Sequence, residues 1–116
     1  DVIFLGAVPA SQRESTLAGA AALLHPIAFD EPFGFSVAEA LCVGTPVIAY
    51  DRGSMRELIR HGTDGFIVDS PATAARAVQW CDNLDRQEIG NAARRRFSVD
   101  QMVARYVEVY RNVLAS

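Results

Sequence analysis

The sequence contains no lysine, and all eleven of its basic residues are arginine. Lysine is a common phosphate ligand, so its absence leaves arginine side chains and backbone amides as the groups that can bind a phosphate. The formal net charge of −3 argues against a nucleic-acid partner, because proteins bind the nucleic-acid backbone with a basic face. We therefore expect no nucleic acid among the partners of this chain.

Cysteines are also few, and the two present, Cys42 and Cys81, lie far apart without the spacing of a metal site. Buried, reduced thiols are favoured over a disulfide or a metal-binding site, which predicts a cytoplasmic protein without a metal cofactor. No apolar run approaches the roughly 18 residues of a membrane span, and the N-terminus lacks the features of a signal peptide. The sequence begins in DVIFLG without an initiator methionine, which suggests a fragment of a longer protein.

The composition is that of an ordinary globular chain. Half of the residues are apolar and 22% are charged, far from the low hydrophobicity and high charge of disordered segments. A chain of 116 residues is expected to form one domain at most.

Short apolar runs alternate with helix signals through residues 1–70. The runs typical of buried strands are Val2–Leu5, Ala21–Leu24, Pro46–Ala49 and Gly65–Val68. A serine followed three residues later by a glutamate, the spacing of a capping box, predicts a helix after each of the first three runs, at Ser11, Ser36 and Ser54. We expect the second helix to end at Gly44 and the third to reach Gly62. This order predicts right-handed crossovers and an α/β fold, with a parallel sheet and helices on both faces.

Past Ser70 the pattern becomes entirely helical. One helix is expected to reach about Cys81, one to begin at Asp85, and one to begin after Ser98. The last helix carries apolar residues at three- and four-residue intervals, which form one stripe: Val99, Met102, Val103, Tyr106, Val107, Tyr110, Val113 and Leu114. Trp80 and the tyrosines fall at positions typical of core residues, so we assign them to packing.

The stretch Glu31–Glu39, EPFGFSVAE, places two carboxylates eight positions apart around a proline, a glycine and a serine. It follows a strand of the predicted parallel sheet, and such sheets bind ligands outside the carboxyl ends of their strands. Gly34 has no Cβ, so a ligand can approach its backbone closely. The first amides of the following helix, around Ser36 to Ala38, lack intrahelical partners and favour an anion such as a diphosphate.

Each glutamate of this stretch can accept hydrogen bonds from sugar hydroxyls. Glu39, near the helix start, suits the vicinal diol of a ribose, and Glu31 suits hydroxyls of a second sugar. Taken alone, Glu39 is also explained by the capping box with Ser36, and Glu31 by a solvated loop charge. The conjunction of both acids with Pro32, Gly34 and a helix start favours a ligand site.

From Glu31 to Val68 the sequence resembles the signature segment of the retaining nucleotide-sugar glycosyltransferases of the GT-B fold, the family called glycosyl transferases group 1. The resemblance rests on the spacing of the two glutamates and on further short motifs: Gly44-Thr45-Pro46, Arg52-Gly53-Ser54, Glu57, and Gly62 with Gly65-Phe66. More weakly it covers the whole chain, which is similar to the latter part of the C-terminal, donor-binding domain. It implies a partial Rossmann-like nucleotide-sugar-binding domain over residues 1–70, and C-terminal helices of the same domain over residues 71–116.

The resemblance also implies a role for each residue of the motif. Glu31 would contact the donor sugar as the catalytic residue, positioning and stabilising it without acting as a nucleophile. The donor-binding positions are Phe33, Gly34 and Phe35 for sugar hydroxyls and phosphate, Ser36 and Val37 for the diphosphate, and Glu39 for the ribose. The implied reaction transfers a glycosyl group from a nucleoside diphosphate sugar with retention at the anomeric carbon, and no metal is expected.

The sequence departs from the family in what it lacks. In the family an arginine and a lysine from earlier in this domain clamp the diphosphate, and the acceptor site lies in a separate N-terminal domain. Neither feature is present, so we expect the leaving-group charge to be neutralised only by amides, and the fragment to be inactive by itself. Met55-Arg56 also replaces the hydrophobic-proline pair that is common before Glu57.

The segment that the family has and this sequence lacks also affects the sheet. The family order implies two absent strands between Val2–Leu5 and Ala21–Leu24, which leaves an unpaired sheet edge. We therefore expect either a rearranged position of the first strand or an edge-to-edge dimer of two copies.

Several residues outside the motif have two interpretations. His25 lies at a strand end near the predicted site, where packing or solvent contact is favoured over a ligand contact. Arg52 can reach an anionic ligand or form a surface ion pair. His61 is expected to cap the third helix. Arg94–Arg96 are expected to form a solvated helix end, so membrane contact is possible but not indicated.

Two other functions are kept open. The same fold can serve as a non-catalytic nucleotide- or phosphate-binding module, because fold does not fix function. A domain that only associates through exposed apolar faces is the third alternative, and in that case replacing Glu31 or Glu39 with alanine would change nothing. The pairing of these two acids favours a sugar nucleotide over a bare phosphate.

Overall fold

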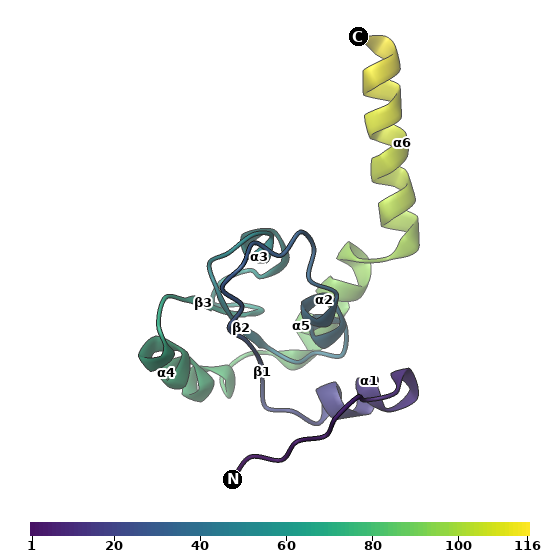
Figure 1. Cartoon of the computed structure of the whole chain (residues 1–116). Coiled ribbons are helices and arrows are strands. Elements are labelled where there is room, and N and C mark those ends of the chain that lie inside the picture. The colour runs from purple at the N-terminus through teal and green to yellow at the C-terminus, as the bar shows by residue number, and fades with distance from the viewer.

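Three short parallel strands form the centre of the computed structural model, which describes residues 1–116 (Figure 1). The elements follow in the order α1 (Ala10–Ala18), β1 (Leu23–His25), α2 (Phe35–Cys42), β2 (Val47–Tyr50), α3 (Met55–Leu58), β3 (Gly65–Val68), α4 (Pro71–Cys81), α5 (Arg86–Arg96) and α6 (Val99–Ala115). The strands lie in the order β1-β2-β3, and both pairs are parallel, with Leu23 opposite Val47 and Val47 opposite Gly65. The predicted α/β fold, a Rossmann-like parallel sheet with flanking helices, is confirmed.

The sheet is buried on both faces. Alternate residues of a strand point to opposite faces, so each strand contributes side chains to both cores. Val47 and Ala49 of β2 belong to a core cluster that includes Val37 and Leu41 of α2 and Ile89 of α5. On the opposite face, a smaller cluster joins the strands to α4: Ile48, Val68, Ala77 and Cys81. Helices therefore cover both faces, as the sequence predicted.

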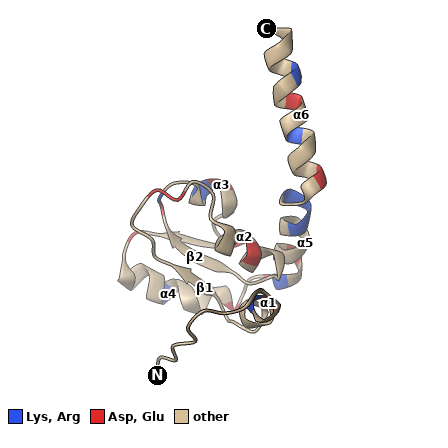
Figure 2. Cartoon of the chain, turned by 45° about the vertical axis from the view of Figure 1, so that its right-hand side comes forward, with Lys and Arg blue, Asp and Glu red and all other residues tan.

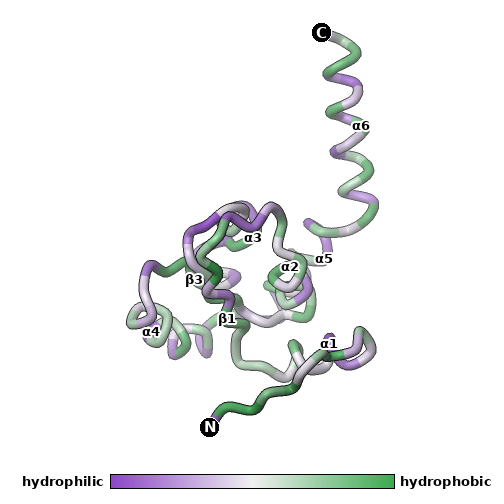
Figure 3. The backbone as a smooth tube through the Cα atoms, viewed as in Figure 1, coloured by the Kyte–Doolittle hydropathy of each residue, from purple (hydrophilic) through white to green (hydrophobic).

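The prediction of a strand at Val2–Leu5 is wrong. These residues precede α1, form no strand and lie exposed, although the N-terminal segment is hydrophobic (Figure 3). Val2 is 99% and Phe4 93% exposed. A strand is stabilised by hydrogen bonds to a neighbouring strand, and the sheet places none beside the outer edge of β1. Dimerisation through this edge stays a prediction.

Two of the later helices begin at the predicted capping residues. The Asp85 carboxylate accepts a hydrogen bond from the Glu88 amide at 3.1 Å, at the start of α5. The Ser98 hydroxyl accepts one from the Gln101 amide at 3.1 Å, at the start of α6. These side chains satisfy amides that have no partner within the helix.

The three serine-glutamate capping boxes are wrong. α1 and α2 begin one residue before the serine, so their N-caps are Pro9 and Gly34, and no side chain caps either helix. Ser54 is the N-cap of α3, but its hydroxyl donates to the Phe33 carbonyl instead of accepting from a helix amide. α3 also ends before Gly62, because the Arg60 amide bonds to the Asp64 side chain and not to a helix carbonyl.

A buried carboxylate ties the end of α3 to α5. The Asp64 side chain is 2% exposed and pairs with Arg60 at 2.7 Å and with Arg96 at 3.3 Å. It also accepts a hydrogen bond from the Arg60 amide at 2.9 Å, which takes this residue out of the helix. Arg96 donates further to the carbonyls of Glu57 and Leu58 at 2.8 and 3.0 Å. Hydrogen bonding to Asp64 raises the pKa of Arg60 above its usual value.

α1 is held by its C-terminal end. It contains no buried residue, but carbonyls in and after its last turn accept hydrogen bonds from other elements. The Thr45 hydroxyl donates to the Leu17 carbonyl at 2.7 Å. The Arg86 guanidinium donates to the carbonyls of Ala18 and Ala20 at 3.0 and 2.8 Å. These bonds fix α1 against the chain that leads into β2 and against the start of α5.

α6 extends away from the rest of the molecule (Figure 1). None of its residues is buried, so the predicted apolar stripe faces solvent. Tyr106 and Tyr110 are 59% and 62% exposed, which corrects their assignment to packing. Trp80 of α4 is 47% exposed but packs edge-on against Phe66, with ring centroids 5.4 Å apart. None of the helices combines the length and the apolar composition that a membrane crossing requires.

Candidate functional site

The predicted motif lies between the carboxyl end of β1 and the second turn of α2, and the segment after β2 holds its loop. The Ser54 amide donates to the Glu31 carbonyl at 3.0 Å, and the Gly53 amide donates to the Asp30 carboxylate at 3.1 Å. Arg52 pairs with the same carboxylate at 3.2 Å, so its charge is used in a surface ion pair. The loops that follow β1 and β2 therefore form one unit.

Gly53 allows the two loops to approach each other. Its φ is 53°, in the left-handed region that favours glycine. A Cβ at this position would lie 2.4 Å from the carbonyl oxygen and 2.5 Å from the amide nitrogen of Glu31. Any other residue here would therefore displace the backbone of the motif.

α2 begins with backbone amides that no other group of the chain satisfies. Gly34 is its N-cap, with a φ of 99° and no side-chain cap. The amides of Phe35, Ser36 and Val37 make no hydrogen bond within the chain. Phe35 and Ser36 are exposed, whereas Val37 is completely buried. The first two are thus the residues that a ligand reaches first.

Glu31 is partly buried beside the start of α2. Its Cγ lies 3.6 Å from the position that a Cβ of Gly34 would occupy. Its neighbour His25 has a lowered pKa, because burial disfavours the imidazolium, and the charge of Glu31 opposes this effect only in part. The Nε2 atom of His25 is buried without a hydrogen-bond partner.

Glu39 lies one turn into α2 and faces α1. Its Oε2 is 2.9 Å from the Nε of Arg13 on α1, and Figure 2 shows an acidic position on α2 above a basic position on α1. Glu39 lines a groove of about 820 Å³, whereas Glu31 is not part of that lining. The structure thus places the two acids at the same helix start but does not bring both into this groove.

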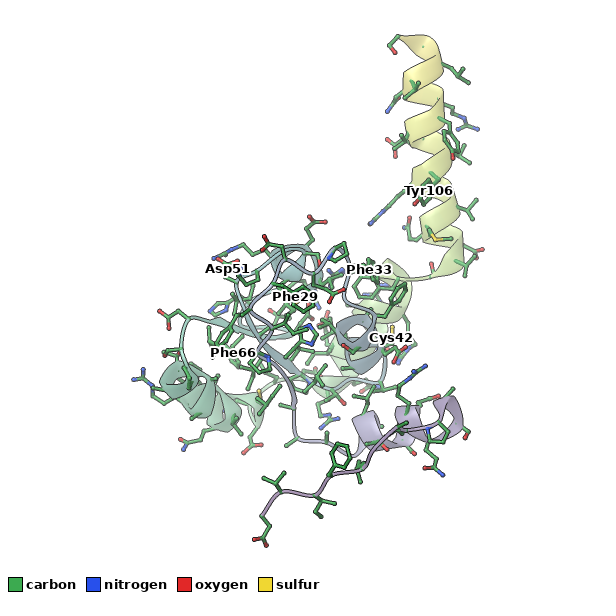
Figure 4. All side chains as sticks on the ribbon, in the orientation of Figure 1. Phe29, Phe33, Cys42, Asp51, Phe66 and Tyr106 are labelled. Carbon is green, nitrogen blue, oxygen red and sulfur yellow. The ribbon has the colours of Figure 1, made fainter.

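The groove lies between α1, α2 and α5 and is largely apolar. Its lining includes Phe33, Phe35 and Phe97, and the ring centroids of Phe33 and Phe35 are 5.0 Å apart. Figure 4 shows Phe33 near the start of α2 and Cys42 near its end. Arg94 adds a charge from α5 and donates to the Cys42 carbonyl at 2.7 Å.

The sequence indicated Arg52 as a cation that can reach a ligand here, but it did not indicate Arg13 or Arg94. The signal for Arg13 is its spacing from Leu17, which lies four residues later on the same face of α1 and packs against the core. Arg94 gave no local signal, because its position depends on the packing of α5 against α2. The expected solvated helix end holds for the exposed Arg94 and Arg95, whereas Arg96 is half-buried and pairs with Asp64.

Three further residues were assigned from the sequence. His61 does not cap α3, which ends before it; its Nδ1 accepts a hydrogen bond from the Ile67 amide at 3.0 Å. Neither Cys42 nor Cys81 forms a disulfide. Burial raises the pKa of both thiols, so they remain protonated and are poor nucleophiles.

Comparison with known proteins gives a family and several relatives. The family model described as "Glycosyl transferases group 1" matches residues 1–96. The D-inositol 3-phosphate glycosyltransferase of Nocardioides sp. is 32% identical over 92% of this chain and 25% of its own length. The phosphatidyl-myo-inositol mannosyltransferase of Mycobacterium leprae is 31% identical over 97% of this chain and 32% of its own length.

The D-inositol 3-phosphate glycosyltransferase of Corynebacterium kroppenstedtii is 37% identical over 74% of this chain and 20% of its own length. The chain thus spans about a fifth to a third of the length of these relatives. The residues matched by the family model include all of α1 and α2.

Proposed function

Because this chain belongs to the glycosyl transferases group 1 family, we propose that it binds the donor for an enzyme that transfers a glycosyl group from a nucleoside diphosphate sugar to an acceptor. We further propose that the transfer retains the anomeric configuration and needs no metal ion. The observation that carries the proposal is the start of α2, where unpaired amides lie between two glutamates after a parallel strand. Open parallel sheets bind nucleotides at this edge.

Each part of the motif then has a role. The amides of Phe35 and Ser36, with the positive end of the α2 dipole behind them, would hold the diphosphate, and the buried amide of Val37 would support them. Glu39 would accept hydrogen bonds from the ribose, and Glu31 would accept them from the donor sugar. As the bond to the sugar breaks, negative charge grows on the diphosphate, and fixed amides stabilise that charge without reorganisation.

The remaining parts of the enzyme would be supplied by other segments of a longer polypeptide. The relatives are three to five times longer than the matched segment, since it covers 20% to 32% of their lengths. We propose that the acceptor site and other donor contacts lie elsewhere in a longer polypeptide, and that these 116 residues are inactive alone. The two unpaired thiols favour the reducing cytoplasm as its location.

Donor binding by the full-length polypeptide that contains this chain tests the proposal. Titration calorimetry with UDP-, GDP- and ADP-sugars is expected to find one donor class that binds. Glu39→Ala is expected to weaken that binding about tenfold or more, because hydrogen bonds to a charged group are lost. Glu108→Ala, on the exposed helix α6, is the matched control and should bind as the wild type does. Failure of every donor to bind would refute the donor-binding function, and unaltered binding by Glu39→Ala would remove the ribose role.

The stereochemistry of the product gives a second test. Proton NMR of the transferred sugar should show the same anomeric configuration as the donor. An inverted product would contradict retention while leaving donor binding intact. Binding without transfer to any acceptor would instead indicate the non-catalytic nucleotide-binding module.

A further inference from the structure

Arg13 and Glu39 place opposite charges side by side in the groove. The Nε of Arg13 lies 2.9 Å from Oε2 of Glu39, and the two side chains remain 51% and 38% exposed. Neither side chain takes part in any other ion pair or hydrogen bond, so the Nη amino groups of Arg13 and Oε1 of Glu39 are free for a ligand. A guanidinium offers five N–H donors, and a carboxylate accepts on both oxygens.

The fold holds Arg13 in this position. Leu17, one turn later in α1, packs against the core. The Thr45 hydroxyl and the Arg86 guanidinium fix the carbonyls at the end of the helix. Arg13 therefore stands on an anchored helix, and its charge is directed toward α2.

The start of α2 belongs to the same groove. Phe35 and Ala38 line it together with Arg13 and Glu39. The Phe35 amide is one of the unpaired amides at the helix start. An anion at these amides and a pair of hydroxyls at Glu39 would thus lie along one surface, within the reach of a long side chain from α1.

Of the two arginines that line the groove, Arg94 is the one that already bonds to other parts of the fold. Arg94 already donates to the Cys42 carbonyl at 2.7 Å and to the Asn91 side chain at 2.6 Å. Arg94 is therefore explained by the packing of α5 against α2. Arg13 makes a single exposed ion pair, and such pairs contribute little to stability.

Resting on the donor-binding function proposed above, we propose that Arg13 is a diphosphate ligand that also orients Glu39. Its Nη groups donate to the phosphate oxygens of the donor, while its Nε holds one oxygen of Glu39 so that the other accepts from the ribose. The planar fork of a guanidinium suits this double contact. Arg13 thereby adds a positive charge where the sequence predicted that only amides would neutralise the leaving group.

Ligands that differ only in their phosphates test this role. The full-length polypeptide is titrated with the nucleoside, the nucleoside monophosphate and the nucleoside diphosphate of the base that the wild type binds. Arg13→Gln should lower the affinity for the diphosphate about tenfold, the effect of one lost charge-assisted hydrogen bond, and should affect the nucleoside much less. Arg13→Lys keeps the charge without the fork and should lie between the two.

Arg76→Gln is the matched control, because it makes the same change of charge on an exposed position of α4 outside the groove. It should bind every ligand as the wild type does. Equal losses for nucleoside and diphosphate in Arg13→Gln would overturn the proposal, since they would indicate a structural role only. Tighter binding of the diphosphate would also overturn it, because Arg13 would then compete with the donor for Glu39.

The same titration separates this inference from the function on which it rests. If the wild type binds a nucleoside diphosphate and Arg13→Gln binds it equally well, only the role of Arg13 fails. If the wild type binds no nucleotide at all, the donor-binding function fails as well.

Discussion

Asp64 is the residue whose replacement should show how firmly α3 is supported. Its side chain is 2% exposed and binds the guanidinium groups of Arg60 and Arg96. It also accepts from the Arg60 amide at 2.9 Å. Asp64→Ala would remove this carboxylate from both arginines and leave the Arg60 amide without an acceptor. Arg60 would keep its ion pair with Glu88 at 3.0 Å, and Arg96 its bonds to the carbonyls of Glu57 and Leu58.

The expected loss of stability follows from the exposure of the three side chains. Removing one partner of a fully buried ion pair costs about 3 to 5 kcal/mol. Arg60 and Arg96 are 40% and 26% exposed, so water replaces part of the lost interaction. We therefore expect a loss near the lower end of that range, about 3 kcal/mol, and a Tm lower by about 10 to 15 °C. Asp64→Asn keeps an acceptor and the shape of the side chain, so about half of this loss is expected.

Urea unfolding followed by circular dichroism measures both variants against the wild type. Asp82→Ala, at an exposed position after α4, is the matched control and should change the free energy of unfolding by no more than about 0.5 kcal/mol. If Asp64→Ala unfolded within about 1 kcal/mol of the wild type, the bonds to the two arginines would not support the fold as described. The loss would also affect the loop Glu31–Gly34, because Met55 and Leu58 of α3 lie against Gly34.

Two other substitutions test how the loop Glu31–Gly34 and the end of β1 are held. Gly53→Ala would place a Cβ 2.4 Å from the Glu31 carbonyl oxygen at a φ of 53°, so we expect a loss of about 2 kcal/mol or more in urea unfolding. Gly62→Ala is its matched control, since Gly62 also has a positive φ but nothing within 4 Å of a Cβ; equal losses in both variants would mean that the two loops are not in close contact. His25 has a pKa lowered below 6.5 by burial, so below that pH the unfolded chain binds the proton more readily and stability should increase as the pH rises toward about 6.5. His25→Asn should flatten this increase, and identical pH profiles for the two proteins would contradict the stated burial of the imidazole.

Elements with strong signals at both ends could be predicted from the sequence. β3 spans Gly65–Val68 as predicted, because a β-branched apolar run lies between a glycine and the polar residues before the next helix. α4 begins at Pro71 after the N-cap Ser70, and proline is tolerated only in the first turn of a helix. Such signals are local, so they do not depend on the rest of the fold.

Two predictions that required a covering partner elsewhere in space were wrong. Val2–Leu5 has the composition of a buried strand, and α6 has the spacing of a buried helix, yet both are exposed. Periodicity shows which face of a segment is apolar, but it does not show whether another element covers that face. In this chain no element covers the apolar run beside the open edge of the sheet or the apolar face of α6.

Of the two explanations of Glu39, the capping box depends on where α2 begins. Its spacing from Ser36 suits both a capping box and a ligand motif, and only the start of α2 distinguishes them. Because α2 begins at Phe35, Ser36 lies inside the helix, and no side chain caps it. The charge of Glu39 is paired instead with Arg13, on a helix that precedes β1. The capping box therefore does not explain Glu39, which lies beside a cation in a largely apolar groove, and its role in ligand binding stays a proposal that the Glu39→Ala titration tests.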